Sequence, residues 1–178
     1  MEAFKKSIVL VGLMGAGKSR VGFELSKILS LPFIDSDREI EKAAGMTIPD
    51  IFERFGEPGF RDGEKKVIER LLSETPKVIA SGGGAFVQPG VKEVIKNKAI
   101  SVWLKADIHT LVERTSRTDN RPLLRGTDPA KKLTELMELR YPIYAEADIT
   151  VVTDNQSPKE MAILIKKQIE TFLGQENQ

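Results

Sequence analysis

Short apolar runs alternate with longer amphipathic segments along the chain. The runs are rich in β-branched residues and predict strands at residues 7–11, 32–34, 78–81, 100–104 and 149–152. Several of these runs lack polar alternation, as strands of a parallel sheet do when helices cover both faces. Between the runs, apolar residues recur at helical spacing, for example at Val21, Leu25, Ile28 and Leu29. The pattern therefore predicts β-α-β units and a mainly parallel α/β sheet.

Two segments interrupt this alternation. Residues 36–74 keep a helical pattern that glycines and prolines break, which predicts a helical insertion after the second strand. Residues 115–128 are polar, rich in arginine and too long for an ordinary connection, so we expect a mobile lid there. A length of 178 residues suits one domain spanning residues 1–178, with both segments inserted into it.

Composition and charge exclude several classes of function. The 27 basic and 26 acidic side chains leave a net charge of +1, too little for a general nucleic-acid or anionic-membrane surface. The absence of cysteine excludes disulfides, zinc–thiolate sites and thiol catalysis. No apolar run is long enough to span a membrane. We therefore expect a cytoplasmic protein that binds neither nucleic acid nor membrane.

The first predicted strand runs into Gly12-Leu-Met-Gly-Ala-Gly17-Lys18-Ser19, which matches the P-loop pattern G-x-x-x-x-G-K-[S/T]. The glycines allow backbone N–H groups to turn toward an anion, and the following helix points its positive end at the same place. Lys18 would reach the β- and γ-phosphates, and the Ser19 hydroxyl would bind Mg²⁺. The motif predicts a nucleotide site; a glycine-rich turn without nucleotide is the weaker alternative.

Two carboxylates, Asp35 and Asp37, follow the second predicted strand, at the edge where open α/β sheets bind ligands. Because residues i and i+2 of an extended strand project to the same side, we expect both to reach the crevice. One can hold water around Mg²⁺, and the other can accept a hydrogen bond from an attacking hydroxyl. The alternative is a helix N-cap at Asp35 or Ser36.

Further candidates lie in the insertion and after the third strand. Arg61 follows a predicted turn at residues 57–59 and could clamp a carboxylate, with Glu64 orienting it; a surface ion pair is the alternative. The glycines at 82–84 imply that some group approaches the backbone closely. No carboxylate follows the third strand, so Asp35 is expected to take the Mg²⁺ side.

Arginines also gather around the expected lid. Arg114, Arg117, Arg121 and Arg125 could neutralise charge on a transferring phosphoryl group, although a solvated face also explains Arg117 and Arg125. Arg140 adds another near the end of the next helix. The only histidine, His109, is expected on a helix surface, and Trp103 is expected in the core.

In their order along the chain, these motifs together resemble the shikimate kinase family. The set comprises the P-loop, Asp35-Ser36-Asp37, Phe60-Arg61-x-x-Glu64, Gly82-Gly83-Gly84, Arg121-Pro122-Leu123-Leu124 and Arg140-x-x-x-Tyr144. The resemblance implies a three-layer α/β/α P-loop kinase with a five-stranded parallel sheet of order 2-3-1-4-5. It also implies transfer of the γ-phosphate of ATP to the 3-hydroxyl of shikimate, in the route to chorismate and the aromatic amino acids. We expect a monomer.

The resemblance also implies roles for individual residues. The catalytic set would be Lys18, Asp37 and Arg121, and the metal side would be Ser19 and Asp35. Nucleotide contacts would come from Gly15, Ala16, Gly17, Lys18, Ser19, Arg20, Arg114, Arg121, Asn155 and Pro158. Arg114 would pack on adenine, the loop at residues 153–158 would be the adenine-binding segment, and Arg121 would lie on the phosphates. Substrate contacts would come from Asp37, Arg61, Gly82, Gly83, Gly84 and Arg140, with the two arginines on the carboxylate.

Arg20 departs from the family, which usually has Thr there, and this change can alter nucleotide affinity. Other small-molecule P-loop kinases, such as a gluconate or nucleoside-monophosphate kinase, remain an alternative. A non-catalytic nucleotide switch is another, although the guanine-reading Asn-Lys-x-Asp is absent from the chain.

Overall fold

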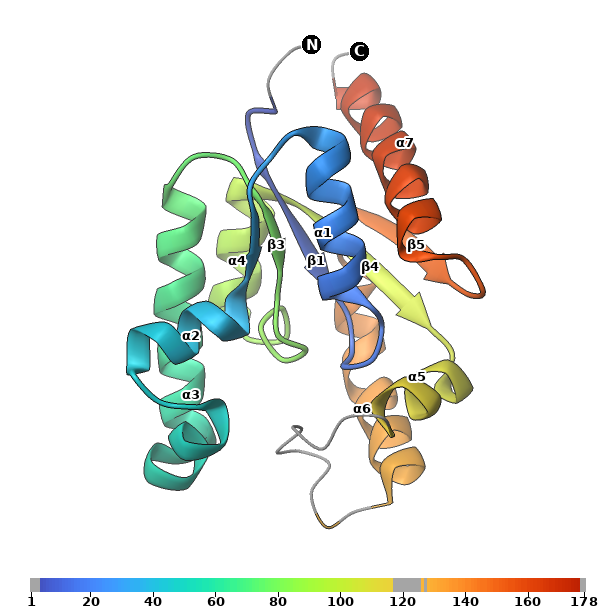
Figure 1. Ribbon diagram of the computed structural model, residues 1–178. Coiled ribbons are helices and arrows are strands. Elements are labelled where there is room, and N and C mark those ends of the chain that lie inside the picture. The colour runs from blue at the N-terminus through green and yellow to red at the C-terminus, as the bar shows by residue number, and fades with distance from the viewer. Residues whose placement is uncertain (1–3, 117–125, 127, 177–178) are drawn as a thin grey trace.

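The computed structural model describes residues 4–116, 126 and 128–176. Within them, five strands form one parallel sheet in the order β2-β3-β1-β4-β5, as the resemblance predicts (Figure 1). The strands are β1 (Ser7–Val11), β2 (Phe33–Asp35), β3 (Val78–Ala80), β4 (Ala99–Ala106) and β5 (Ile149–Thr153). Each overlaps a strand predicted from the sequence, with ends that differ by at most two residues.

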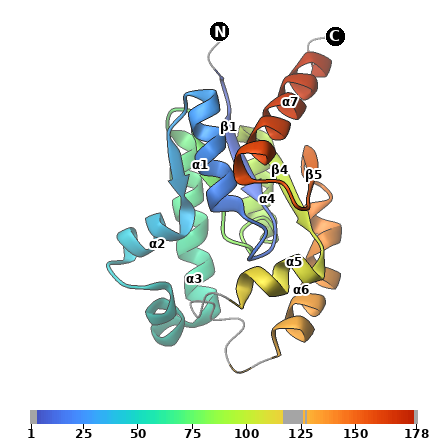
Figure 2. The same cartoon turned by 45° about the vertical axis from the view of Figure 1, so that its right-hand side comes forward.

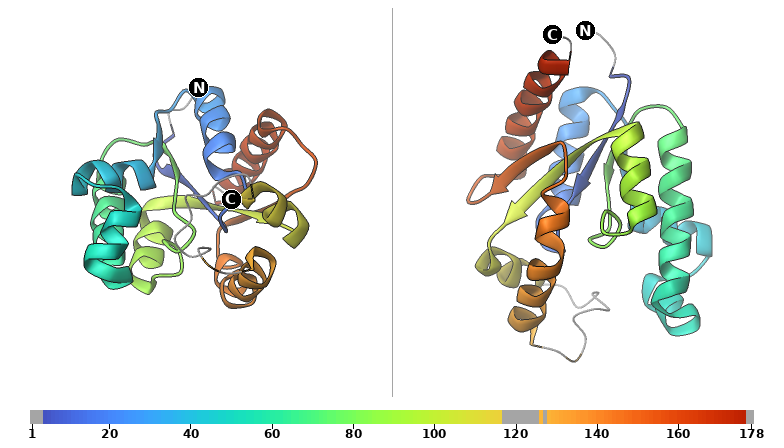
Figure 3. Two further views of the ribbon diagram at one scale, coloured as in Figure 1. Left: turned by 60° about the horizontal axis from the view of Figure 1, so that its bottom comes forward. Right: turned by 180° about the vertical axis from the view of Figure 1, so that it is seen from behind.

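Helices cover both faces of the sheet. They are α1 (Lys18–Leu29), α2 (Ser36–Ala44), α3 (Ile48–Ser73), α4 (Pro89–Lys98), α5 (Ile108–Thr115), α6 (Pro129–Tyr144) and α7 (Pro158–Glu176). Helices α1 and α7 pack side by side on one face, and α4 and α6 lie on the other (Figures 1 and 3). The three-layer α/β/α prediction is therefore confirmed. Among the described residues, no helix is long and apolar enough to cross a membrane.

Burial follows the position of each strand in the sheet. The central strand β1 is buried along its whole length, with residues 8–11 fully inaccessible, because helices cover both of its faces. The edge strand β5 instead alternates, with Ile149 and Val151 buried and Val152 exposed. Trp103 of β4 is 3% exposed, which confirms its predicted place in the core. His109 is an exposed residue of α5, also as predicted.

The expected insertion consists of α2 and the first half of α3. Gly45 adopts a left-handed conformation, with φ 67°, and ends α2, while the Thr47 hydroxyl accepts a hydrogen bond from Asp50 N and caps α3. The predicted turn at residues 57–59 is wrong: those residues are helical, and the break lies at Gly56, with φ 68° and ψ −178°. Pro58 then occupies the first turn after this break, where its missing N–H costs little.

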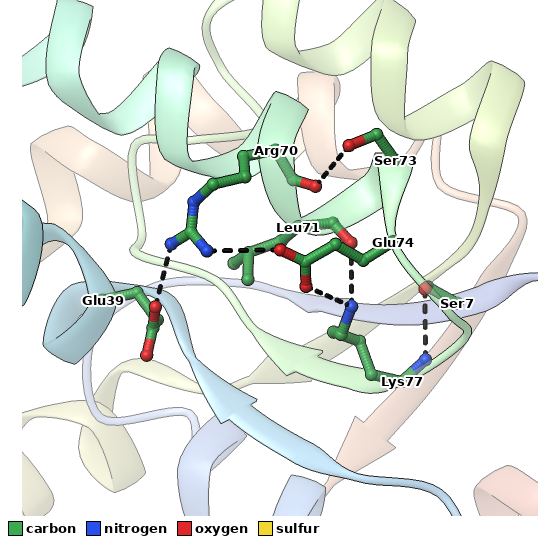
Figure 4. A network of polar contacts seen from close by, with 7 residues as sticks. All are labelled: Ser7, Glu39, Arg70, Leu71, Ser73, Glu74 and Lys77. Atoms are coloured by element: carbon green, nitrogen blue, oxygen red, sulfur yellow. Dashed lines mark hydrogen bonds and ion pairs between the residues drawn. The ribbon is translucent and has the colours of Figure 1, made fainter.

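A polar network joins these helices to each other and to the segment before β3 (Figure 4). Arg70 of α3 donates to Glu39 of α2 at 2.8 Å and to Glu74 at 3.3 Å. Lys77, just before β3, is 4% exposed; its ammonium donates to Glu74 at 2.9 Å and to the Leu71 carbonyl at 3.1 Å. The network fixes the end of α3 to α2 and to the sheet.

The carboxyl ends of the strands lie between two groups of helices. Figure 2 shows α2 and the first half of α3 on one side of these ends, and α5 with the start of α6 on the other. The loops that carry the predicted chemistry emerge between the two groups. Most of the expected lid, residues 117–125 and 127, lies outside the described residues.

Candidate active site

The P-loop connects β1 to α1. Positive φ angles occur at Gly12, Gly15 and Gly17, with values of 144°, 84° and 94°. Residues that carry a Cβ rarely adopt such angles. Gly17 is the N-cap of α1 and provides no side-chain cap, so the start of this helix offers backbone N–H groups to a ligand. The Lys18 ammonium donates to the carbonyls of Gly12 at 2.7 Å and Leu13 at 2.9 Å. The predicted lysine is thus held over the loop.

A pocket of about 400 Å³ opens in front of this loop. Its lining is Gly15, Ala16, Gly17, Lys18, Ser19, Arg20, Val21, Asp35, Asp37, Ala80, Ser81, Gly82, Gly83, Arg114, Thr153, Gln156, Pro158 and Met161. Every predicted nucleotide residue that the structure describes is among them, except one. The exception is Asn155, which is exposed and does not line the pocket. Arg121 lies outside the described residues.

Gln156, the next residue along the loop, does line the pocket. The side-chain oxygen of Gln156 accepts a hydrogen bond from Asp154 N at 3.0 Å, which links the residues on either side of Asn155. Thr153, the first residue of the loop that the resemblance assigns to adenine, also lines the pocket, and its buried hydroxyl has no hydrogen-bond partner. Thr153 ends an alternating edge strand with Ile149 and Val151 on the same buried side, so the strand pattern also accounts for its burial.

Ser19 and Asp35 meet at the entrance to the phosphate region. The Ser19 hydroxyl donates to Asp35 Oδ2 at 2.8 Å, while Asp35 Oδ1 accepts from Asp37 N at 3.0 Å and caps α2. Asp35 therefore serves both of its predicted uses, helix cap and pocket carboxylate. A hydroxyl beside one carboxylate suits Mg²⁺, which takes few carboxylates and keeps several waters. The described residues contain no cluster of three or more His, Cys, Asp or Glu that could hold a metal ion.

The reason given for Asp37 is wrong, although its location is right. Strand β2 ends at Asp35, and Asp37 lies in the first turn of α2, so the strand rule for residues i and i+2 does not apply. Both carboxylates line the pocket nevertheless, because the helix begins at the carboxyl edge of the sheet.

The three glycines after β3 each lie against a different predicted side chain. A Cβ on Gly82 would lie 2.9 Å from Asp37 Oδ1 and 3.0 Å from Glu64 Oε2. A Cβ on Gly83 would lie 3.4 Å from Arg140 Nη1, and one on Gly84 would lie 2.2 Å from Arg61 Nη2. The prediction of close approach to this backbone is confirmed, and the approaching groups include side chains of the protein itself.

Arg61 and Glu64 form a buried pair rather than the surface pair of the alternative reading. Arg61 Nη1 donates to Glu64 Oε1 at 2.8 Å, and the Glu64 side chain is fully buried. Burial raises the pKa of Glu64 above 4.5, while the neighbouring Arg61 opposes this shift. Glu64 Oε2 and Arg61 Nε are buried without a hydrogen-bond partner, so the pair retains unused polar atoms.

Arg140 comes to the same place from the opposite side, on α6. It is 8% exposed, and its Nη1 is buried without a hydrogen-bond partner. Tyr144, one turn later on the same helix, is fully buried and donates its hydroxyl to the Gly83 carbonyl. Burial raises the pKa of Tyr144 to about 12, so it remains a neutral donor. No role was predicted for Tyr144, although its i+4 spacing from Arg140 places both on one helix face.

Comparisons with known proteins agree with this arrangement. The family model described as "Shikimate kinase" matches residues 14–170. A shikimate kinase of Caulobacter vibrioides is 58% identical over 158 residues, covering 89% of this chain and 78% of that protein. One of Paramagnetospirillum magneticum is 53% identical over 171 residues, covering 96% of this chain and 88% of that protein. The structure of the shikimate kinase from Acinetobacter baumannii in complex with shikimate has a TM-score of 0.92 at 41% identity and covers 95% of each chain.

A family model that spans most of the chain, close relatives and a matching fold agree with the motifs and with the residues that the fold brings together. This chain belongs to the shikimate kinase family.

Proposed function

We propose that this kinase transfers the γ-phosphate of ATP to the 3-hydroxyl of shikimate, using the residues gathered around Gly82, Gly83 and Gly84. The observation that carries the proposal is the buried, unpartnered Nη1 of Arg140 beside Gly83. A buried guanidinium nitrogen without an acceptor is costly unless an anion binds it. The carboxylate of shikimate is such an anion.

Arg61 would bind the same carboxylate from the opposite side. Its side chain is 12% exposed and is held by Glu64, so little conformational entropy is lost when the substrate binds. Two planar guanidiniums that approach one carboxylate select an acidic substrate over a neutral sugar. Gluconate also carries a carboxylate, so the two arginines alone do not exclude it as an acceptor.

Asp37 would hold the reacting hydroxyl and accept its proton. It lines the nucleotide pocket and contacts Gly82, so it lies between the P-loop and the two arginines. Holding the hydroxyl in line with the γ-phosphate supplies much of the rate enhancement in phosphoryl transfer, which needs positioning more than covalent catalysis.

The phosphates of ATP would lie on the P-loop backbone, with Lys18 beside them and Pro158 and Gln156 near the adenine. Ser19 and Asp35 would hold Mg²⁺, which when bound neutralises charge on the phosphate oxygens. Arg121 is proposed to bind the phosphates from the lid, and the lid would exclude water, which competes as a nucleophile.

Steady-state kinetics with ATP and a set of acceptors tests the proposal. We expect ADP formation that depends on shikimate, a much lower kcat/KM for shikimate methyl ester, which lacks the carboxylate charge, and none above background with gluconate. Omitting Mg²⁺ with a chelator should abolish turnover. Equal kcat/KM for shikimate and its methyl ester would contradict the carboxylate assignment, and turnover of gluconate instead of shikimate would contradict the acceptor.

A further inference from the structure

Arg114 reaches from the last turn of α5 to the P-loop, a contact that spans nearly a hundred residues of sequence. Its Nη1 donates to the carbonyl oxygens of Gly15 and Ala16, each at 3.2 Å. The loop also packs directly on α5, because a Cβ on Gly15 would lie 3.0 Å from Thr115 Cγ2 and 3.2 Å from the Leu111 carbonyl. One side of the P-loop thus rests on α5.

These two hydrogen bonds determine how the peptide planes of the loop are oriented. In a trans peptide, the C=O and N–H groups point in opposite directions, so holding the Ala16 carbonyl toward Arg114 directs the N–H of Gly17 the other way. The preceding peptide is held at both ends: its carbonyl, from Gly15, accepts from Arg114, and its N–H, from Ala16, donates to the Leu13 carbonyl at 3.2 Å. The glycines of the loop need such support, because glycine has the largest backbone freedom to lose.

We propose that Arg114 is a positioning residue for the phosphates, which acts by holding the P-loop backbone in its binding conformation before ATP arrives. This inference rests on the proposed nucleotide site and adds to it a role distinct from packing on adenine. The guanidinium also keeps a positive charge beside the loop, since a Cβ on Gly17 would lie 3.4 Å from Arg114 Nη1.

The two roles predict different responses to a ligand without adenine. If Arg114 only packs on the base, its replacement weakens the binding of ATP and leaves the binding of inorganic tripolyphosphate unchanged. If it holds the loop, its replacement weakens the binding of both ligands. Arg114→Met keeps an unbranched apolar side chain that can pack on a base but removes the charge and the donors. Arg114→Lys keeps the charge and a donor to the carbonyls.

Two variants serve as matched controls. Gln156→Ala changes the pocket wall after β5, away from the P-loop, and should weaken ATP alone. Arg20→Met removes one positive charge from the lining of the same pocket, but Arg20 is not among the donors to the Gly15 and Ala16 carbonyls that the structure describes. It therefore measures what loss of charge alone does to tripolyphosphate binding.

The experiment combines calorimetric titration of ATP and tripolyphosphate with amide hydrogen exchange of residues 12–20 in the unliganded chain. We expect Arg114→Met to raise the Kd of tripolyphosphate about 10-fold or more, as loss of charge-assisted hydrogen bonds would, and Arg114→Lys to recover part of it. We also expect faster exchange of the P-loop amides in Arg114→Met and not in Arg20→Met.

Three results would overturn the inference. Unchanged tripolyphosphate affinity in Arg114→Met would leave Arg114 with the adenine role alone. Equal losses of tripolyphosphate affinity in Arg20→Met and Arg114→Met would show that the loss of positive charge alone explains the effect. Weaker binding without faster exchange in the unliganded loop would make Arg114 a direct phosphate ligand instead. Failure of wild-type protein to bind ATP would contradict the proposed function itself, which separates the two tests.

Discussion

Each glycine of residues 82–84 leaves room for a different side chain of the site. Gly84 is the tightest of the three, because a Cβ there would fall 2.2 to 2.4 Å from three atoms of the Arg61 guanidinium. That guanidinium is the far end of a flexible side chain, so it can move aside when a Cβ takes its place. A methyl group at this position would therefore displace Arg61 without preventing folding.

Gly84→Ala is expected to raise the KM for shikimate about 10-fold or more, because a charge-assisted hydrogen bond to the carboxylate is lost, while the KM for ATP changes little. Steady-state kinetics with each substrate varied in turn measures both values. Gly63→Ala is the matched control: it lies on α3 two residues from Arg61, and a Cβ there meets nothing within 4 Å. A parental KM for shikimate in Gly84→Ala would contradict the placement of Arg61.

The buried carboxyl of Glu64 makes stability depend on pH. Because burial raises its pKa above 4.5 in the folded chain, the folded state keeps a proton that the unfolded state has lost once the pH exceeds 4.5. The free energy of unfolding contributed by Glu64 therefore falls as pH rises through its folded pKa. Urea unfolding across this range should show a decline in wild type that is smaller in Glu64→Gln, which keeps an acceptor for Arg61. If the free energy of unfolding depends on pH in the same way in wild type and Glu64→Gln, the assignment of this decline to Glu64 is wrong.

The limits of sequence reasoning also lie at this scale. The P-loop, Asp35, Arg61 and Arg140 could be recognised because their residue types are tied to a chemistry. Gln156 and Tyr144 lie in segments that the resemblance includes, but residue type alone assigns neither of them a role. Their roles depend on how a loop folds after β5 and on which carbonyl a buried hydroxyl reaches. The place of Asp37 was predicted correctly for the wrong reason, because the boundary between β2 and α2 falls between Asp35 and Ser36.

At the scale of elements, α3 is the helix that joins the insertion to the sheet. Its first half lies in the insertion with Phe52 stacked on Phe60, at a ring-centroid distance of 4.8 Å. Its second half buries Val67, Ile68 and Leu71 in the core. Arg61 and Glu64 form their pair between these two parts of α3. The core fixes the second half of α3, and the polar network of Figure 4 joins that half to α2.

Lys77→Met should lower the free energy of unfolding by about 1–3 kcal/mol, because the buried Leu71 carbonyl loses its side-chain donor and Glu74 loses its partner. Lys66→Met is the matched control. Lys66 also forms an ion pair, with Asp62 at 2.8 Å, but its side chain is 73% exposed, so its loss should leave stability almost unchanged. Urea titrations of both variants measure the difference. Equal changes in the free energy of unfolding would show that the burial of Lys77 makes no contribution to stability.

At the scale of the whole molecule, strand order was available only through the resemblance. The apolar runs predicted five strands and a parallel sheet, and the buried core confirms that pattern. Periodicity alone contains no information about which strands are neighbours, because β2, β3 and β1 are brought together by crossovers of very different length. The break in α3 was also beyond periodicity, since several glycines and prolines competed for it and Gly56 alone adopts a positive φ within that helix.

Because α3 belongs to both the insertion and the core, we propose that residues 1–178 form one cooperative domain and expect the two parts to unfold together. Trp103, the only tryptophan, is 3% exposed and reports on the core. A second chain carrying Trp103→Phe and Phe55→Trp places the probe in the insertion, where Phe55 is 59% exposed and tolerates a larger ring. For each chain, the urea transitions followed by tryptophan fluorescence and by far-ultraviolet circular dichroism should coincide, as two-state unfolding requires. If the insertion is instead a separate unit held only by surface contacts, the tryptophan fluorescence of the second chain will change at lower urea than its circular dichroism.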